Sequence, residues 1–358
     1  MSTDTAPKID EKRLHEFMGK VVAELGAVMN GALVLIGDEL GLYRAMADSK
    51  AVTPTQLAEK TSTSERMVRE WLAAQAAGGY VTYNASEKTF TLPPEQALAL
   101  ATENSPCFVA GGFDVPRSVY LDLPQIIQAF RDGRGLGWDR RSPSLFRGTE
   151  RFFRSTYLES LTSSWIPALE EVEDKLSQGA KVADIGCGHG ASTLLMGQAY
   201  PQSQFVGFDF HPKSIETART IAEIAGIKDS VTFEVASAKE YPGGDYDLVT
   251  FFDCLHDMGD PVGAAEHVRR SLKPNGTWMI VEPFAHDQLE SNFNPIGRVF
   301  YAASAMICTP ASMAQEVGLA LGAQAGELRL REVVTKGGFN RFRRATETPF
   351  NIVYEARP

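Results

Sequence analysis

The sequence predicts an α/β protein in which a mostly helical winged-helix unit precedes a doubly wound, mostly parallel sheet. Three observations predict this fold class. Two short helices and a hairpin pattern occur in the first hundred residues, strand and helix patterns alternate after Gly179, and a glycine-rich loop follows the first of those strands. The chain has 358 residues, of which 44% are hydrophobic, so it can form two or three packed units.

The N-terminal unit is expected to span residues 1–100 and to begin with a long helix. Apolar residues recur at helical spacing over 17–29, and residues 32–46 are apolar on most faces. A lone surface helix with such a stripe would be exposed, so the stripe favours packing against a second copy of the chain. A homodimer is the expected assembly.

The next segment reads as a helix-turn-helix followed by a wing. Thr53-Pro54 is typical of a helix start, and Ser62 with Glu65 predicts a capping box for a second helix that ends near Gly78. The wing strands are expected at residues 80–83 and 89–92.

The rest of the chain is expected to form two parts. Residues 101–170 predict a helical connector, and residues 171–358 predict the doubly wound domain. Its seven strands are placed at 181–185, 204–209, 231–235, 247–253, 277–281, 339–345 and 351–355.

The glycine-rich loop carries the strongest functional signal. Gly186, Gly188 and Gly190 lie between an apolar strand and a helix, where glycines let the backbone approach a ligand and free N–H groups face it. Asp209, about twenty residues on, ends the next strand, where a carboxylate can accept hydrogen bonds from ribose hydroxyls. An adenosine cofactor fits this pattern.

The glycine spacing alone leaves the cofactor open. Gly186-x-Gly188-x-x-Ala191 also satisfies the relaxed dinucleotide pattern, so an NAD-dependent oxidoreductase is compatible with it. Asp184 places a carboxylate near the loop, which suits a methionine ammonium group and is unfavourable for a pyrophosphate.

At these motifs the sequence resembles the class I methyltransferases. Asp184 to Gly190 resembles their first motif, Asp209 their ribose-binding acid, and LKPNGTWMIVE the entry to their fifth strand. The resemblance implies a Rossmann-like, seven-stranded domain that binds S-adenosyl-L-methionine. It adds further cofactor-binding candidates, which are Phe210, Ser237, Ala238, Phe252 and Asp253. The sequence lacks the acidic residue frequent in that family at Ala236–Ala238.

The layout is also similar to the small-molecule O-methyltransferases of plants and bacteria, and to bacterial winged-helix methyltransferases labelled as transcriptional regulators. In the O-methyltransferases a histidine-aspartate pair after the fourth strand carries the general base, and His256-Asp257 matches it. The resemblance implies that Glu282 orients the histidine. A neutral imidazole, with an ordinary pKa near 6.5, suits removal of a hydroxyl proton.

The acceptor implied by this resemblance is a small, largely apolar metabolite. Aromatic residues that could line its pocket are Phe113, Trp138, Phe152, Phe153 and Tyr157, although ordinary core packing is the more common role for each of them taken alone. Asp253, His256 and Asp257 could also bind magnesium, as in catechol-type methyltransferases. Their spacing fits the imidazole base more closely, so no metal is expected.

Charge disfavours nucleic acid as a partner. The formal net charge is −10, and the second helix of the helix-turn-helix balances Arg66 and Arg69 against Glu65 and Glu70. Two functions without catalysis still fit the sequence: a transcriptional regulator that uses the cofactor as a ligand, and a protein that only binds the cofactor. With short apolar runs and four dispersed cysteines, the sequence predicts a cytoplasmic protein with reduced thiols and no membrane partner.

Overall fold

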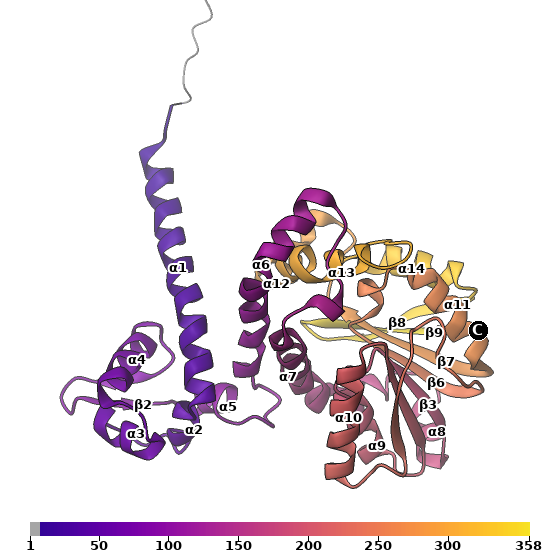
Figure 1. The fold of residues 1–358 in the computed structure, drawn as a ribbon, viewed down its shortest axis with the longest axis horizontal. Coiled ribbons are helices and arrows are strands. Elements are labelled where there is room, and N and C mark those ends of the chain that lie inside the picture. Colours follow the sequence, from indigo (N-terminus) through magenta and orange to yellow (C-terminus); the bar gives the residue numbers. More distant parts are fainter. Residues whose placement is uncertain (1–7) are drawn as a thin grey trace, which may run out of the picture. The chain divides into compact units, whose positions relative to one another are not determined.

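The computed structural model describes residues 8–358 and divides the chain into two compact units, Met1–Phe113 and Asp114–Pro358 (Figure 1). The expected connector is split between them. Phe108 and Ala110 pack in the core of the first unit, whereas the helices that begin at Asp114 belong to the second. The chain therefore divides at residue 113, in place of the three parts expected at 1–100, 101–170 and 171–358.

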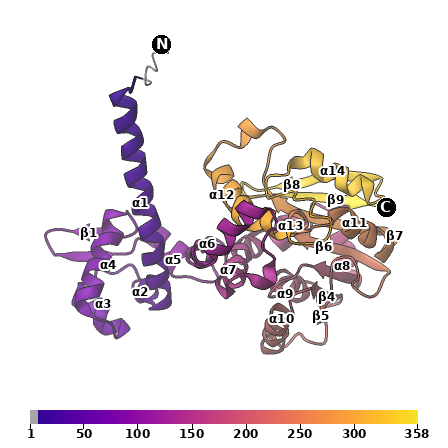
Figure 2. The same ribbon diagram turned by 45° about the horizontal axis from the view of Figure 1, so that its top comes forward.

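The first unit is a winged helix around its own apolar core (Figure 2). Val34, Tyr43, Leu57, Trp71 and Leu72 are buried there. Its elements are α1 (Glu11–Glu39), α2 (Leu42–Ala45), α3 (Pro54–Thr61), α4 (Glu65–Ala77), β1 (Thr82–Asn84), β2 (Thr89–Thr91), α5 (Pro94–Leu100) and η1 (Ala110–Phe113). The antiparallel pair β1–β2 forms the wing expected from the sequence.

Of the two helix starts expected from the sequence, at α3 and α4, only the start of α3 agrees with the structure. The Thr53 hydroxyl accepts a hydrogen bond from the Gln56 amide, and the Gln56 side chain accepts one from the Thr53 amide, so α3 begins in a capping box. The capping box expected from Ser62 and Glu65 was wrong. Ser62 instead ends α3 in a left-handed conformation, and Ser64 precedes α4.

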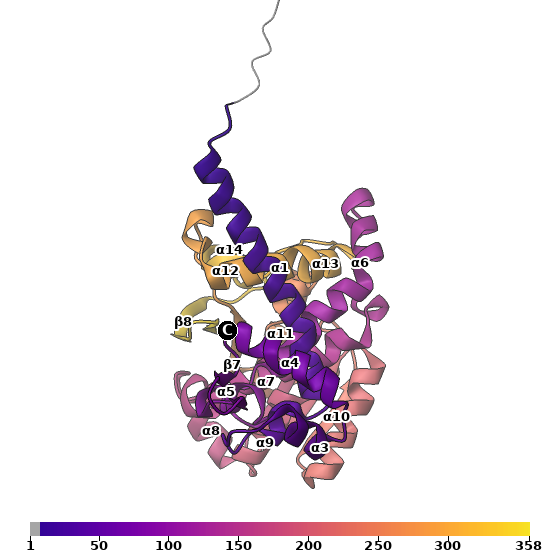
Figure 3. The ribbon, with the colours of Figure 1, turned by 90° about the vertical axis from the view of Figure 1, so that its left-hand side faces the viewer.

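Helix α1 exposes most of its apolar stripe, and its N-terminal half extends beyond α3 and α4 (Figure 3). Phe17, Val22, Leu25 and Met29 are between 61% and 70% exposed. Because the helix is continuous over 29 residues, it is also long and apolar enough to cross a membrane, with 17% of its most apolar window buried. Composition and length alone are weak support for a membrane, since an apolar packing helix passes the same test.

The second unit is built on a seven-stranded sheet with the order β5-β4-β3-β6-β7-β9-β8 (Figure 1). The strands are β3 (Lys181–Ile185), β4 (Gln204–Asp209), β5 (Val231–Val235), β6 (Tyr246–Phe252), β7 (Leu272–Pro283), β8 (Arg341–Glu347) and β9 (Asn351–Arg357). All seven expected strands are present. The pairs from β5 to β7 are parallel, and β9 runs antiparallel to both of its neighbours.

Helices cover both faces of this sheet. Alternate strand residues point to opposite faces, so Val182 packs with α8 (Val172–Gln178), α9 (Ala191–Ala199) and α10 (Pro212–Ala225), whereas Ala183 packs with α11 (Pro261–Ser271) and α14 (Gly326–Lys336). Both faces of the central strands β3 and β6 are buried, which explains their nearly continuous apolar sequences.

A third group of helices forms a small core of its own in this unit. Leu145, Phe300, Ile307 and Cys308 pack together there. The elements around this core and the remaining short turns are α6 (Asp114–Asp132), η2 (Trp138–Arg140), α7 (Pro143–Ser160), η3 (Leu161–Trp165), η4 (Leu255–Asp257), η5 (Leu289–Asn292), α12 (Pro295–Ala303), η6 (Ser304–Cys308) and α13 (Thr309–Met313).

Candidate functional site

A pocket of about 400 Å³ opens at the carboxyl ends of β3, β4 and β6, within the second unit. Open α/β sheets bind their ligands at this edge. Eight of the ten predicted cofactor-binding residues line it: Gly186, Gly188, Asp209, Phe210, Ser237, Ala238, Phe252 and Asp253. Asp184 and Gly190 do not.

The glycine loop forms one wall of the pocket. Gly186 has a φ of 72°, and a Cβ at this residue would lie 2.9 Å from Cys254 Sγ, so the loop needs glycine for both its conformation and its packing. Gly190 has a φ of 83° and lies against Phe233, where a Cβ would come within 2.5 Å of the ring. Its predicted contact with the cofactor is replaced by a packing role at the start of α9.

Asp209 is held at the pocket edge by backbone amides. The amide of Gly188 donates to Asp209 Oδ2 at 3.0 Å, and the amide of His211 donates to Oδ1 at 2.8 Å. Burial raises the pKa of Asp209, while these amides lower it. The carboxylate is thereby fixed beside the glycine loop, and each oxygen keeps a second lone pair for a ribose hydroxyl.

Asp184 lies beneath the loop, so the expected contact with a methionine ammonium group was wrong. Its side chain is fully buried and accepts hydrogen bonds from the hydroxyls of Ser192, Thr193 and Thr250 at 2.6–2.9 Å. Burial raises its pKa to about 6, against the lowering effect of the three hydroxyls. Asp184 instead ties β3 to α9 and β6, the elements on either side of the loop.

Helix α7 forms a wall of the pocket that sequence reasoning found only in part. Trp138, Phe153 and Tyr157 line the pocket as expected, whereas Phe152 does not and Phe113 packs in the first unit. The residues missed include Phe146, Thr149 and Glu150 on α7, Ser214 on α10, and Lys239, Met258, Asp260, Gln315 and Glu316.

Helical spacing could have revealed part of that wall. Phe146, Thr149, Phe153 and Tyr157 recur every three or four residues, which places them on one face of α7. Phe146 also stacks on His211, with 4.3 Å between the ring centroids. An aromatic helix face therefore lies opposite the polar ends of the strands.

The three predicted catalytic residues come together after β6, at η4 and the end of β7. Nδ1 of His256 lies 2.5 Å from Glu282 Oε2, and Nε2 lies 3.2 Å from Asp257 Oδ1. The Leu255 amide donates to the other Glu282 oxygen at 3.0 Å, which fixes that carboxylate. His256 is only 3% exposed and lies behind the pocket wall, whereas Asp257 lines the pocket.

The charge of this cluster is set by the two carboxylates. Burial alone would lower the pKa of His256, but Glu282 and Asp257 outweigh it and raise that pKa well above 6.5. The two carboxylates therefore favour the protonated form of the ring. Asp257 Oδ1 has no hydrogen bond of good geometry within residues 8–358, although it lies at ion-pair distance from the ring.

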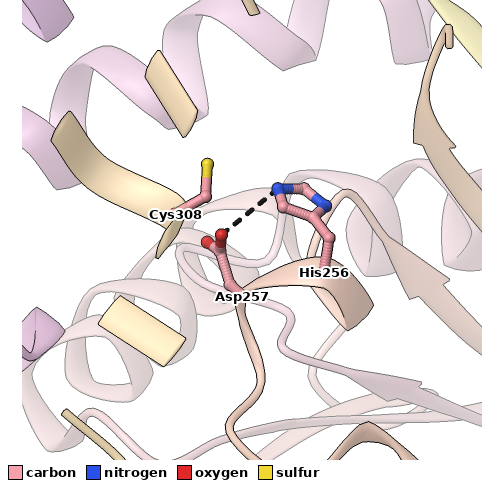
Figure 4. Close-up of side chains that lie close together, drawn as sticks. All are labelled: His256, Asp257 and Cys308. Carbon is pink, nitrogen blue, oxygen red and sulfur yellow. Dashed lines mark ion pairs between the residues drawn. The ribbon is translucent and has the colours of Figure 1, made fainter. Parts of the chain in front are cut away.

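Cys308 completes a group that could hold a metal ion. One ligand atom each from His256, Asp257 and Cys308 lies within 4.8 Å of the others, and all three residues are buried (Figure 4). Cys308 comes from η6, a π-helical turn, and burial raises the pKa of its thiol to about 12. The protonated thiol and the ring between two carboxylates make this a polar cluster, and the absence of a metal requirement stays a prediction.

The pocket and its glycine loop have counterparts in known proteins. Residues 176–331 match a family described as a methyltransferase domain. The C-terminal unit carries a methyltransferase domain. In front of it, residues 28–102 match the Rv2258c-like winged helix-turn-helix domain. The methyltransferase prediction is confirmed for this domain. The cofactor prediction is confirmed at the same level, since solved structures of this fold contain S-adenosylmethionine or S-adenosylhomocysteine.

Curated relatives of known name match parts of the chain. One is 27-O-demethylrifamycin SV methyltransferase from Amycolatopsis mediterranei, with 30% identity over 141 residues. The alignment covers 39% of this chain and 46% of that protein, so the chain spans less than half the length of this curated relative.

Solved structures share the complete fold. Human N-acetylserotonin methyltransferase in complex with S-adenosylmethionine superposes with a TM-score of 0.71 at 17% identity, covering 100% of this chain and 99% of that one. An O-methyltransferase family protein from Burkholderia thailandensis superposes with a TM-score of 0.68 at 17% identity, covering 95% and 98%. A winged-helix unit followed by a class I methyltransferase fold is therefore confirmed as the architecture.

Proposed function

We propose that this protein transfers the methyl group of S-adenosylmethionine to a hydroxyl of a small, largely apolar metabolite, with His256 as general base. The observation that carries the proposal is the Glu282–His256–Asp257 cluster beside the pocket that contains the glycine loop and Asp209. The cofactor supplies an electrophilic methyl group on its sulfonium when bound. The protein positions both reactants and accepts one proton.

The residues on one side of the pocket could bind the adenosine part of the cofactor. Asp209 would accept hydrogen bonds from the ribose hydroxyls, because its carboxylate is already fixed by two loop amides. Ser237, Ala238 and Phe210 line the pocket beyond it and would surround the adenine. The apolar acceptor would then contact the aromatic face of α7.

Proton removal would use His256 and Asp257 together. Asp257 lines the pocket and lies 3.2 Å from Nε2 of the ring, so the proton of an acceptor hydroxyl would pass to the Asp257 carboxylate and from there to Nε2 of the deprotonated ring. Glu282 holds Nδ1 and so directs Nε2 toward Asp257. Such a pair favours hydroxyl acceptors, since an amine needs less assistance from a base once it is uncharged.

A transfer assay with matched acceptors tests the proposal. The protein is incubated with S-adenosylmethionine labelled in the methyl group and with pairs of phenols and anilines of the same shape. We expect the label on the phenols, measured after organic extraction and chromatography. Label on the anilines alone would contradict hydroxyl transfer, and no label on any acceptor would favour a cofactor-binding protein without catalysis.

We also propose that the chain forms a homodimer through α1. Its exposed apolar face, which includes Phe17, Val22 and Leu25, is a continuous hydrophobic surface that a second copy would bury. Nucleic acid is a poorer partner, because Arg66 and Arg69 on α4 pair with Glu70 and Glu65 at 2.6 Å. The cytoplasmic location stays a prediction.

The dimer is tested by the molar mass in solution. We expect twice the chain mass for the wild type and the single mass for Phe17→Glu combined with Leu25→Glu, since two buried carboxylates per subunit oppose association. Lys12→Glu with Lys20→Glu is the matched control on the polar side of α1, where the side chains are 87% and 67% exposed. A monomeric wild type would contradict the proposal, and binding to lipid vesicles would indicate a membrane partner instead.

A further inference from the structure

The strand order sets the direction in which the cofactor crosses the sheet. β3 lies between β4 and β6, so Asp209 at the end of β4 and Asp253 after β6 stand on opposite sides of the glycine loop. Ser237 and Ala238 follow β5, beyond Asp209. With adenine and ribose on that side, the amino-acid end of S-adenosylmethionine extends over the loop toward Asp253.

Asp253 has an unusual backbone conformation at this point. Its φ is 50°, in the left-handed region that non-glycine residues adopt mainly where function or packing requires it. Its amide donates to the Val281 carbonyl at 2.8 Å, which holds the residue at the sheet edge. Asp253 is also one of the residues that line the pocket.

Only one of the two carboxylate oxygens of Asp253 accepts a hydrogen bond in the described part of the chain. Oδ1 accepts a hydrogen bond from Asn351 Nδ2 at 2.8 Å, whereas the buried Oδ2 has no hydrogen-bond partner within residues 8–358. A buried carboxylate oxygen without a donor is costly, so native sites supply one from protein, water or ligand. Asp184, the acid first expected to meet the ammonium group, has its donors already.

The cationic side chains near Asp253 are paired with other carboxylates, so the charge of Asp253 is not balanced by them. Burial and the Glu282 carboxylate raise the pKa of Asp253 well above its usual value, while His256 and Asn351 lower it. The His256 ring lies between Glu282 and Asp257, and the pocket lysine, Lys239, lies 2.7 Å from Glu316. A cationic ligand group would stabilise the ionised carboxylate.

We propose that Asp253 binds the ammonium group of the cofactor's methionine part through Oδ2, an inference that rests on the proposed function. The contact fixes the amino-acid end of the cofactor, while Asp209 fixes the ribose end. The two acids therefore hold the cofactor from both sides of the glycine loop, and Asp253 takes the role that the sequence suggested for Asp184.

Asp253→Asn tests the contact with little change in shape. Asparagine tolerates the left-handed conformation and keeps an oxygen for Asn351, but it removes the negative charge. The wild type and the variant are titrated with S-adenosylmethionine, S-adenosylhomocysteine and 5′-methylthioadenosine, which has no amino-acid part. We expect the first two to bind about 10- to 100-fold more weakly to the variant and the third to bind equally well.

Glu316→Gln is the matched control, because it removes a carboxylate from the same pocket at the Lys239 side. It should leave the ratio of affinities for S-adenosylmethionine and 5′-methylthioadenosine unchanged. Unchanged affinities for all three ligands in Asp253→Asn, or equal losses for all three, would overturn the ammonium contact. Loss for S-adenosylmethionine alone would assign Asp253 to the sulfonium and overturn it too. A wild type that binds none of the three would refute the proposed function itself.

Discussion

His256→Ala is expected to lower the rate of methyl transfer by about a hundredfold or more while cofactor affinity stays near the wild-type value. The ring lies behind the pocket wall, so it does not contribute to the cofactor surface, but its Nε2 lies at ion-pair distance from the pocket-lining Asp257. The rate is measured with labelled cofactor at saturating acceptor, and the affinity by titration. A variant with an unchanged rate would contradict the base assignment.

Alanine at His256 leaves the Glu282 and Asp257 carboxylates without the ring between them, so their repulsion could also lower the rate. A second variant, at Glu282, separates this effect from the loss of the base. The proton on His256 must leave before the ring can accept another, so the rate should rise with pH through the raised pKa of His256. Glu282→Gln removes a charge that raises this pKa, and the rise should move to lower pH. A purely structural His256 would leave the profile unmoved, and melting temperatures separate folding defects from catalytic ones.

Asp209→Ala is expected to weaken S-adenosylmethionine binding by roughly 1 to 3 kcal/mol, or about 5- to 150-fold. The carboxylate accepts hydrogen bonds from the amides of Gly188 and His211, so alanine removes the ribose contact and also frees the loop that surrounds the cofactor. Asp209→Asn keeps the shape and should lose less. Equal affinity of the alanine variant, measured by calorimetric titration, would refute the ribose contact.

The fold was largely predictable because its signals are local. Central strands buried on both faces gave apolar runs between glycine and polar turns, and each of the seven expected strands overlaps an observed one. The second capping box failed for a local reason too: Ser62 has a φ of 52°, so it ends α3 and cannot start α4. The division at residue 113 depends on which core Phe108 joins, and sequence pattern does not carry that information.

The site was predictable where residues follow strand ends and less so where helices pack over them. Gly186, Asp209 and Asp253 lie at the carboxyl ends of three adjacent parallel strands, so the strand order alone brings them together. The depth of a side chain is not visible in a motif. Asp184 belongs to the loop motif, but it is buried and hydrogen-bonded to three hydroxyls. Glu150 lines the pocket from a helix that the sequence assigned to a connector.

The wild-type arm of the Asp209 titration, extended to NAD, tests the central claim most directly. Both cofactors carry an adenosine, and the spacing of Gly186 and Gly188 fits either, so binding by the purified protein is the direct test of the choice. The account predicts that S-adenosylmethionine and S-adenosylhomocysteine bind at micromolar concentration and that NAD does not. Binding of NAD without S-adenosylmethionine would contradict it and indicate an oxidoreductase on the same sheet.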